Sequence, residues 1–119
     1  MVKIVLGRCS RDFVEFWQAL ELQPNDKHAL VARSRCQLLL GLAQEALADA
    51  DAAMAHDRHF IKAILAKAEA LYHLGDFEHS LVYYHRGQRL RPEQNAFRLG
   101  VQKAQEAIEN CIGSESAHF

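Results

Sequence analysis

The stretch KAILAKAEALYHLGDFEHSLVYYHRGQRLRPE, residues 62–93, decides the fold of this chain. It contains two runs of apolar and small residues at helical spacing, which are separated by a turn at Gly75 and followed by Pro92. Glycine readily takes the positive φ that ends a helix, and proline stops a helix because it lacks the backbone donor. We therefore predict a hairpin of two helices, Ile61–His73 and Phe77–Leu90.

The hairpin pattern recurs with a period of 34 residues. Three series of positions keep the same phase: Gly7, Gly41 and Gly75, then Pro24, Arg58 and Pro92, then Ala19, Ala53 and Gly87. Such a period is typical of helix–turn–helix repeats of the tetratricopeptide type, in which each unit buries its apolar face against its neighbours. The sequence therefore predicts an all-α fold, a tetratricopeptide-repeat α-solenoid of antiparallel helix hairpins with a C-terminal capping helix.

The period also predicts how the chain is divided. We expect one repeat domain over residues 1–112 and a flexible tail over residues 113–119. Within the domain, we predict a partial repeat at 1–26, complete repeats at 27–60 and 61–92, and a capping helix at 93–112. In the first complete repeat, Asn25 and Asp26 are good capping residues for a helix that ends at Gly41, and a second helix should run from about Ala43 to His56.

The last helix should be amphipathic and should close the stack of repeats. Pro92 fits the first turn of this helix, and Gly113 is expected to end it. The remaining face is polar, as expected of a terminal capping helix. The apolar face is predicted to contain Phe97, Leu99, Val101, Ala104 and Ile108.

The repeat pattern is incomplete at the N-terminus. Counting one period back from Lys27 gives a position before Met1, so the first repeat has its second helix, from Ser10 to Leu22, but only the last turns of its first helix. We hypothesise that the chain is a fragment, or an alternative start, of a longer protein. Self-association is an open alternative because an apolar helix face lacks half of its partner there. That face contains Phe13, Phe16 and Trp17.

Composition argues against several classes of partner. The 119 residues carry a formal net charge of −1, so no global field attracts nucleic acid or an anionic membrane. No stretch approaches the roughly 18–20 apolar residues of a membrane span, and the opening MVKIVL is too short for a signal peptide. Cysteines occur three times, an odd number with no paired spacing, which fits reduced thiols: Cys9, Cys36 and Cys111. We expect a soluble intracellular protein that binds neither nucleic acid nor membrane.

Histidines and cysteines do not form a catalytic or metal-binding pattern. The seven histidines are scattered, and neither an HExxH nor a CxxC motif occurs. Glycines in the turns occur singly, so the chain has no glycine-rich phosphate loop. Cys36 falls on a small packing position and is expected in the core, while Cys9 is expected to be exposed. We therefore expect no enzyme activity, no metal and no cofactor.

Three segments carry a resemblance to a known family: LVARSRC (30–36), KAEALYHLGDFEHSLVYYHRG (67–87) and FRLGVQKAQEAIENCIGS (97–114). Together they resemble the N-terminal repeats of the tetratricopeptide subunit of the ciliary outer-dynein-arm docking complex. The resemblance covers roughly residues 20–114. It is weaker before Leu20, and the long C-terminal part of that family has no counterpart in this chain.

The resemblance implies a function. It suggests a non-catalytic scaffold in the cytoplasm and the ciliary axoneme that helps dock outer dynein arms onto doublet microtubules. Its implied partners are coiled-coil docking subunits, outer dynein arm chains and the tubulin doublet. The alternative is a cytoplasmic co-chaperone or dynein-arm assembly factor that uses the same repeat groove.

In this family of repeats, partners bind in a concave groove lined by the first helix of each hairpin. The spacing of three, four and three residues predicts a set on one side of each such helix. The alternative is that these are ordinary solvated or packing residues. The predicted groove residues are His28, Val31, Arg35 and Leu38, then Lys62, Leu65, Glu69 and Tyr72.

The groove does not resemble the clamp of repeat proteins that hold the C-terminal carboxylate of chaperones. Those proteins use lysine and asparagine at fixed groove positions, whereas this chain has Val31, Arg35, Leu65, Ala66 and Glu69 there. A buried carboxylate needs several donors, and a glutamate would repel it. We therefore do not expect this chain to bind chaperone tails.

A local basic cluster is the other charge feature of the sequence. It is expected either to contact an acidic partner or, more simply, to be a solvated helix end. Arg33 and Lys67 stand where such repeats more often have an apolar residue; their stems can pack while their heads reach water, or a partner. The cluster consists of Arg86, Arg89, Arg91 and Arg98.

Overall fold

The computed structural model describes residues 26–116 and the side chains of residues 26–111. This part of the chain contains five α-helices and no strand. They are α2 (Lys27–Leu39), α3 (Ala43–His56), α4 (Ile61–His73), α5 (Phe77–Leu90) and α6 (Asn95–Ser116). The predicted all-α class is confirmed, and the bounds of α4 and α5 are those expected from the sequence.

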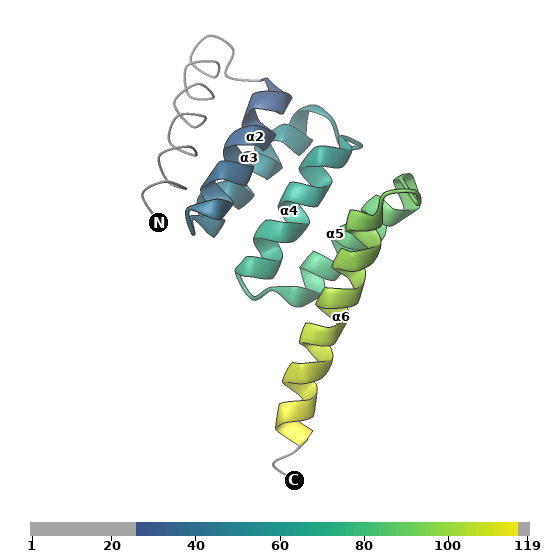
Figure 1. The fold of residues 1–119 in the computed structure, drawn as a ribbon. Helices are drawn as coiled ribbons and strands as arrows, with labels where there is room; N and C mark the ends of the chain where they lie inside the picture. The colour runs from purple at the N-terminus through teal and green to yellow at the C-terminus, as the bar shows by residue number, and fades with distance from the viewer. Residues whose placement is uncertain (1–25, 117–119) are drawn as a thin grey trace.

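The helices stack as two antiparallel hairpins followed by α6. Helix α2 pairs with α3, α4 pairs with α5, and α6 packs on both helices of the second hairpin. Contacts also join α2 to α4 and α4 to α6. Figure 1 shows these three helices on one side of the stack, with α3 and α5 behind them. The first helix of each unit therefore lines one common face.

Both hairpin turns use glycine in the same way. Gly41 and Gly75 have φ values of 83° and 87°, in the left-handed region that side chains disfavour. The amide following each glycine donates to a carbonyl of the last helical turn, from Leu42 to Gln37 at 2.8 Å and from Asp76 to Leu71 at 3.0 Å. This is the Schellman arrangement, and it confirms the two predicted turns.

Polar side chains fix the helix ends and the hairpins. The carboxylate of Asp26 accepts from the His28 amide at 3.1 Å, as expected of a capping residue. The hydroxyl of Ser34 on α2 donates to the Ala46 carbonyl of α3 at 2.6 Å. The Ser80 hydroxyl makes the matching bond between α5 and α4, at 2.8 Å. Each hairpin is thus closed by one buried serine.

Alanine dominates the core between the hairpins and brings the helix backbones close together. The largest fully buried side chains, Ile64, Tyr84 and Phe97, gather between the second hairpin and α6. The buried alanines of α3 and α4 are Ala46, Ala50, Ala53, Ala63, Ala66, Ala68 and Ala70.

Two aromatic rings hold α6 against α5 by filling the space over glycines. A Cβ atom at Gly87 of α5 would overlap the Phe97 ring, and one at Gly100 of α6 would overlap the Tyr84 ring. Both rings are buried. The Tyr84 hydroxyl has no hydrogen-bond partner among the described residues, and its burial raises the pKa of Tyr84. Each helix thus contributes one ring and one glycine, and the two contacts fix the position of α6 against α5.

We expect Gly100→Ala to lower the free energy of unfolding by about 2 kcal/mol, because the buried Tyr84 ring cannot move away from the new methyl group. Urea denaturation followed by circular dichroism measures the change. Gln105→Ala, on the exposed face of the same helix, should change it by less than about 0.5 kcal/mol. A neutral or stabilising Gly100→Ala, as for an exposed helical glycine, would contradict the close contact.

Three expectations for the last helix are wrong. Helix α6 begins at Asn95 because Pro92 lies in a turn in which the Gln94 amide donates to the Arg91 carbonyl at 3.2 Å. The helix continues through Gly113, since one helical glycine costs only about 1 kcal/mol relative to alanine. Leu99 is 56% exposed, because it is two residues from Phe97 and so lies on another side of the helix.

The predictions for the N-terminal segment concern residues outside those described: the partial first repeat, Cys9 and the three aromatic residues before position 20. The same holds for the tail beyond Ser116. None of the helices within residues 26–116 is long and apolar enough to cross a membrane.

Candidate functional site

The face shared by α2, α4 and α6 presents most of the predicted groove residues. His28 and Arg35 are exposed on α2, where Leu38 is half-buried. The His28 ring meets the Phe60 ring edge-on, with centroids 5.0 Å apart. On α4, Lys62 is exposed, and the half-buried residues are Leu65, Glu69 and Tyr72.

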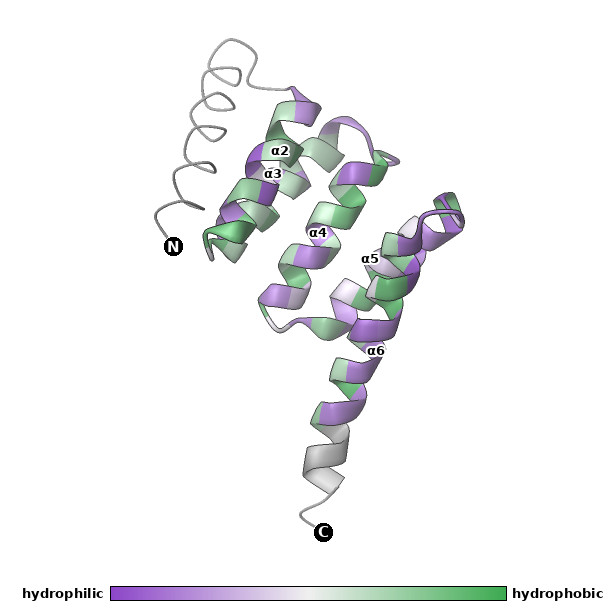
Figure 2. Cartoon of the chain, viewed as in Figure 1, coloured by the Kyte–Doolittle hydropathy of each residue, from purple (hydrophilic) through white to green (hydrophobic). Residues whose placement is uncertain are grey.

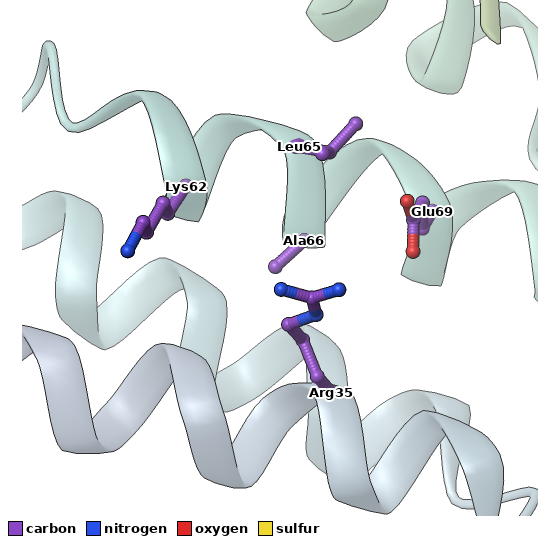
Figure 3. A pocket seen from close by; sticks show the side chains of 5 residues that line it. All are labelled: Arg35, Lys62, Leu65, Ala66 and Glu69. Atoms are coloured by element: carbon purple, nitrogen blue, oxygen red, sulfur yellow. The ribbon is translucent and has the colours of Figure 1, made fainter. Parts of the chain in front are cut away.

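Four of the predicted residues line one shallow hollow between α2 and α4. It has a volume of about 30 Å³, roughly the space of one water molecule. Figure 3 shows the Arg35 guanidinium reaching from α2 toward α4, between Lys62 and Glu69. The hollow is lined by Arg35, Lys62, Leu65, Ala66 and Glu69. The face therefore offers a surface for a partner's side chains rather than a deep pocket.

Val31 does not belong to this surface. Its side chain is only 3% exposed and lies in the core cluster with Ala50, Ala53 and Ala63. A side chain with this burial has no area left to offer a partner, so we remove Val31 from the groove set.

Helix α6 adds residues to the face that the sequence analysis missed. The Lys103 ammonium lies 4.5 Å from the centroid of the Tyr72 ring, a cation–π distance. Phe77 meets the same ring edge-on at 5.1 Å. Leu99, one turn before Lys103, lies on the same side of α6. The 34-residue period could have found both, since it relates Leu99 to Leu65 and Lys103 to Glu69.

The structure divides the predicted basic cluster. Arg86 and Arg89 line a hollow of about 400 Å³ that is separate from the groove, together with residues of the α3–α4 turn. Arg91 forms an ion pair with Glu93 at 3.7 Å instead. Arg98 is exposed on α6 and does not line this hollow.

Arg33 and Lys67 bind aspartates of α3 within the chain. The Arg33 guanidinium donates to both carboxylate oxygens of Asp49, at 2.6 and 2.7 Å, and this hydrogen bonding raises the pKa of Arg33. Lys67 lies 2.6 Å from Asp51 and over the Tyr83 ring at 4.4 Å. These contacts give both cations a structural role within the chain, and their side chains are 16% and 18% exposed.

The described residues contain no group of three His, Cys, Asp or Glu side chains that could hold a metal ion. Cys36 is buried, as its small packing position predicted, and Cys111 is exposed.

Two stacked helical hairpins, a further packed helix and a shared open face define a tetratricopeptide repeat domain. Solved structures confirm this fold. The first tetratricopeptide domain of human RPAP3 matches with a TM-score of 0.85 over 94% of this chain and 88% of that one, at 19% identity. The first such domain of Spaghetti, bound to the HSP90 peptide SRMEEVD, matches with a TM-score of 0.81 at 19% identity, over 89% and 84% of the two chains. No protein-family model matches the chain.

Curated proteins are similar to this chain in sequence, and they confirm the resemblance to a ciliary docking subunit. Outer dynein arm-docking complex subunit 4 of Xenopus laevis is 56% identical over 102 residues, 86% of this chain. The Homo sapiens protein of the same name is 52% identical over 111 residues, 93% of this chain. The chain spans only 19% and 16% of the length of these two relatives.

Proposed function

We propose that this chain is a non-catalytic docking module that helps attach outer dynein arms to axonemal doublet microtubules. The observation that carries the proposal is identity above 50% to outer dynein arm-docking complex subunit 4 across nearly the whole chain. The fold supports it, since the chain has an open interaction face and, among its described residues, no catalytic constellation. The proposed location is the ciliary axoneme.

The groove is proposed as the docking surface. Arg35 and Lys62 line the same hollow as Glu69 and Leu65, and Lys103 lies over the Tyr72 ring of the same face. This mixture suits an internal segment of a partner that has one apolar and several polar side chains. It suits a free C-terminal carboxylate poorly, because Glu69 lines the hollow. The proposed partners are coiled-coil docking subunits, outer dynein arm chains and the tubulin doublet.

A matched pair of leucine and valine variants tests the groove. Leu99 on the groove side of α6 and Val82 on α5 are both large, apolar and exposed, at 56% and 51%. We expect Leu99→Gln to reduce retention of the tagged chain in isolated axonemes about ten-fold, because a partner would bury this side chain. Val82→Gln should leave retention unchanged. Quantitative mass spectrometry of the axonemes measures both.

Crosslinking of the same axonemes tests which proteins the chain contacts and which face it uses. Crosslinks from Lys62 or Lys103 to docking-complex or dynein subunits would support the groove as the docking face. Recovery of the chain only on unassembled dynein chains in the cytoplasm, with none in axonemes, would overturn the proposal in favour of an assembly factor. Equal loss of retention in Leu99→Gln and Val82→Gln would argue against the groove while leaving axonemal docking in place.

A further inference from the structure

We propose that the chain has a second binding surface, which takes an acidic polypeptide segment. It is the basic hollow, formed by Arg58 and His59 of the α3–α4 turn and by Arg86, Arg89 and Leu90 of α5. Its volume of about 400 Å³ would hold several side chains. None of its residues lines the groove hollow, so one chain can present both surfaces at once.

The basic hollow lies where the chain passes from one repeat unit to the next. Its residues belong to the α3–α4 turn and to the last turns of α5, at the end of the stack that also carries the α5–α6 turn. Figure 2 shows both turns as largely hydrophilic. A partner would reach this end without entering the groove.

The charge of the basic hollow is not neutralised from within the described chain. Asp57, next to Arg58, is held by Lys27 at 2.8 Å and accepts from the His59 amide. Glu93 is held by Arg91. Within the described residues, no carboxylate lines the hollow, and no ion pair involves Arg58 or Arg89. The arginines therefore face the opening with their full charge.

One arginine of the basic hollow is preorganised. The Arg86 guanidinium carbon lies 4.8 Å from the centroid of the Tyr83 ring. Stacking on a ring restricts the side chain without removing its charge. A planar guanidinium can then bind a carboxylate through two parallel hydrogen bonds.

The repeat fold does not itself require cations at these positions. One period earlier, Arg86 and Arg89 correspond to Ala52 and Ala55. Arg58 corresponds to Pro24 and Pro92, so arginine replaces the proline seen in the other two periods. The same fold is therefore built elsewhere in this chain with small residues or proline. The repeat pattern therefore does not require arginine at these positions, which favours a role in binding.

The chemistry of the basic hollow favours an acidic polypeptide over nucleic acid. Leu90 gives it an apolar wall that is 39% exposed, which a peptide side chain could cover. Among the described residues, no Phe, Tyr or Trp lines it, so bases would find no stacking platform. The net charge of −1 also argues against a nucleic-acid surface. Aspartate- and glutamate-rich segments fit all three observations.

The test measures binding of a short fluorescein-labelled polyglutamate peptide to the purified chain by fluorescence anisotropy. We expect Arg58→Gln combined with Arg89→Gln to weaken binding about ten-fold, because two bidentate contacts are lost. Arg91→Gln combined with Arg98→Gln is the matched control, since it removes the same charge outside the basic hollow. We expect the control to weaken binding by less than about two-fold at near-physiological salt.

Three outcomes would overturn this proposal: no binding of the peptide to the unmodified chain, equal weakening by both double variants, and tighter binding of oligothymidylate than of polyglutamate. Thermal unfolding of each variant by circular dichroism verifies that the fold is kept. Because the groove is untouched, axonemal retention through Leu99 is a separate measurement, and either surface can fail alone.

Discussion

Replacing Phe97 with alanine should lower the free energy of unfolding by about 3–5 kcal/mol. The Phe97 side chain is fully buried, and its ring fills the space over Gly87 where a Cβ atom would otherwise stand. Among the other described side chains of α6, only that of Ala104 is fully buried, and it is small. The cavity would thus be left at the main contact between α5 and α6.

Urea denaturation followed by circular dichroism measures this loss, and Leu99→Ala is the matched control. Leu99 lies on the same helix and is also large and apolar, but it is 56% exposed. Its truncation should cost less than about 1 kcal/mol because little buried area is lost. Equal losses for the two variants would contradict the burial that the structure gives to Phe97.

Phe97 also connects stability to the proposed function. Loosening α6 would remove Lys103 from its place over the Tyr72 ring, and Leu99 would leave the groove side with it. In the axoneme experiment, Phe97→Ala should therefore lose crosslinks from Lys103 before those from Lys62, which lies on α4. Together with Tyr84, Phe97 therefore positions the residues that α6 contributes to the groove.

Much of the fold could be predicted because turn chemistry marks the repeat. Gly41 and Gly75 occupy the left-handed φ region, and each hairpin turns at its glycine as expected. The last helix was predicted less well. Gly113 is followed by no second stop signal, and a lone helical glycine is only a weak one. Leu99 was assigned to the buried apolar face because it is a leucine. It lies two residues from Phe97, however, and so points to another side of the helix.

The candidate sites were predictable where helical spacing or the repeat period relates their residues. Helical spacing brought Lys62, Leu65 and Glu69 together, and the structure places all three at one hollow. Spacing could not show that Val31 is buried, since burial depends on the helices packed around it. For the basic hollow, sequence reasoning found Arg86 and Arg89 but not Arg58. Arg58 and Arg89 are distant in sequence, and the fold brings them together.

The second large effect is expected at the ion pair between α2 and α3. Arg33 and Asp49 have side chains only 16% and 9% exposed, and two hydrogen bonds join them. We expect Asp49→Ala to lower the free energy of unfolding by about 3 kcal/mol, because Arg33 then keeps a largely buried charge without this carboxylate. Urea denaturation again gives the value.

Asp51→Ala is a close control, because Asp51 lies on the same helix as Asp49 and also forms an ion pair, with Lys67 of α4. Asp51 is 48% exposed, and water can replace it beside Lys67. Its loss should cost less than about 1 kcal/mol. If the two variants lowered the free energy of unfolding by the same amount, burial of the ion pair would not explain the loss.

A double variant separates the attraction of this pair from the cost of burying its charges. Arg33→Met combined with Asp49→Ala removes both charges and keeps apolar volume beside α3. Buried ion pairs are often no more stabilising than apolar residues of similar size, so this variant should recover most of the loss caused by Asp49→Ala alone. Such a recovery would mean that the pair sets which faces of α2 and α3 meet, while the serine contact and the alanine packing supply the stability of the hairpin.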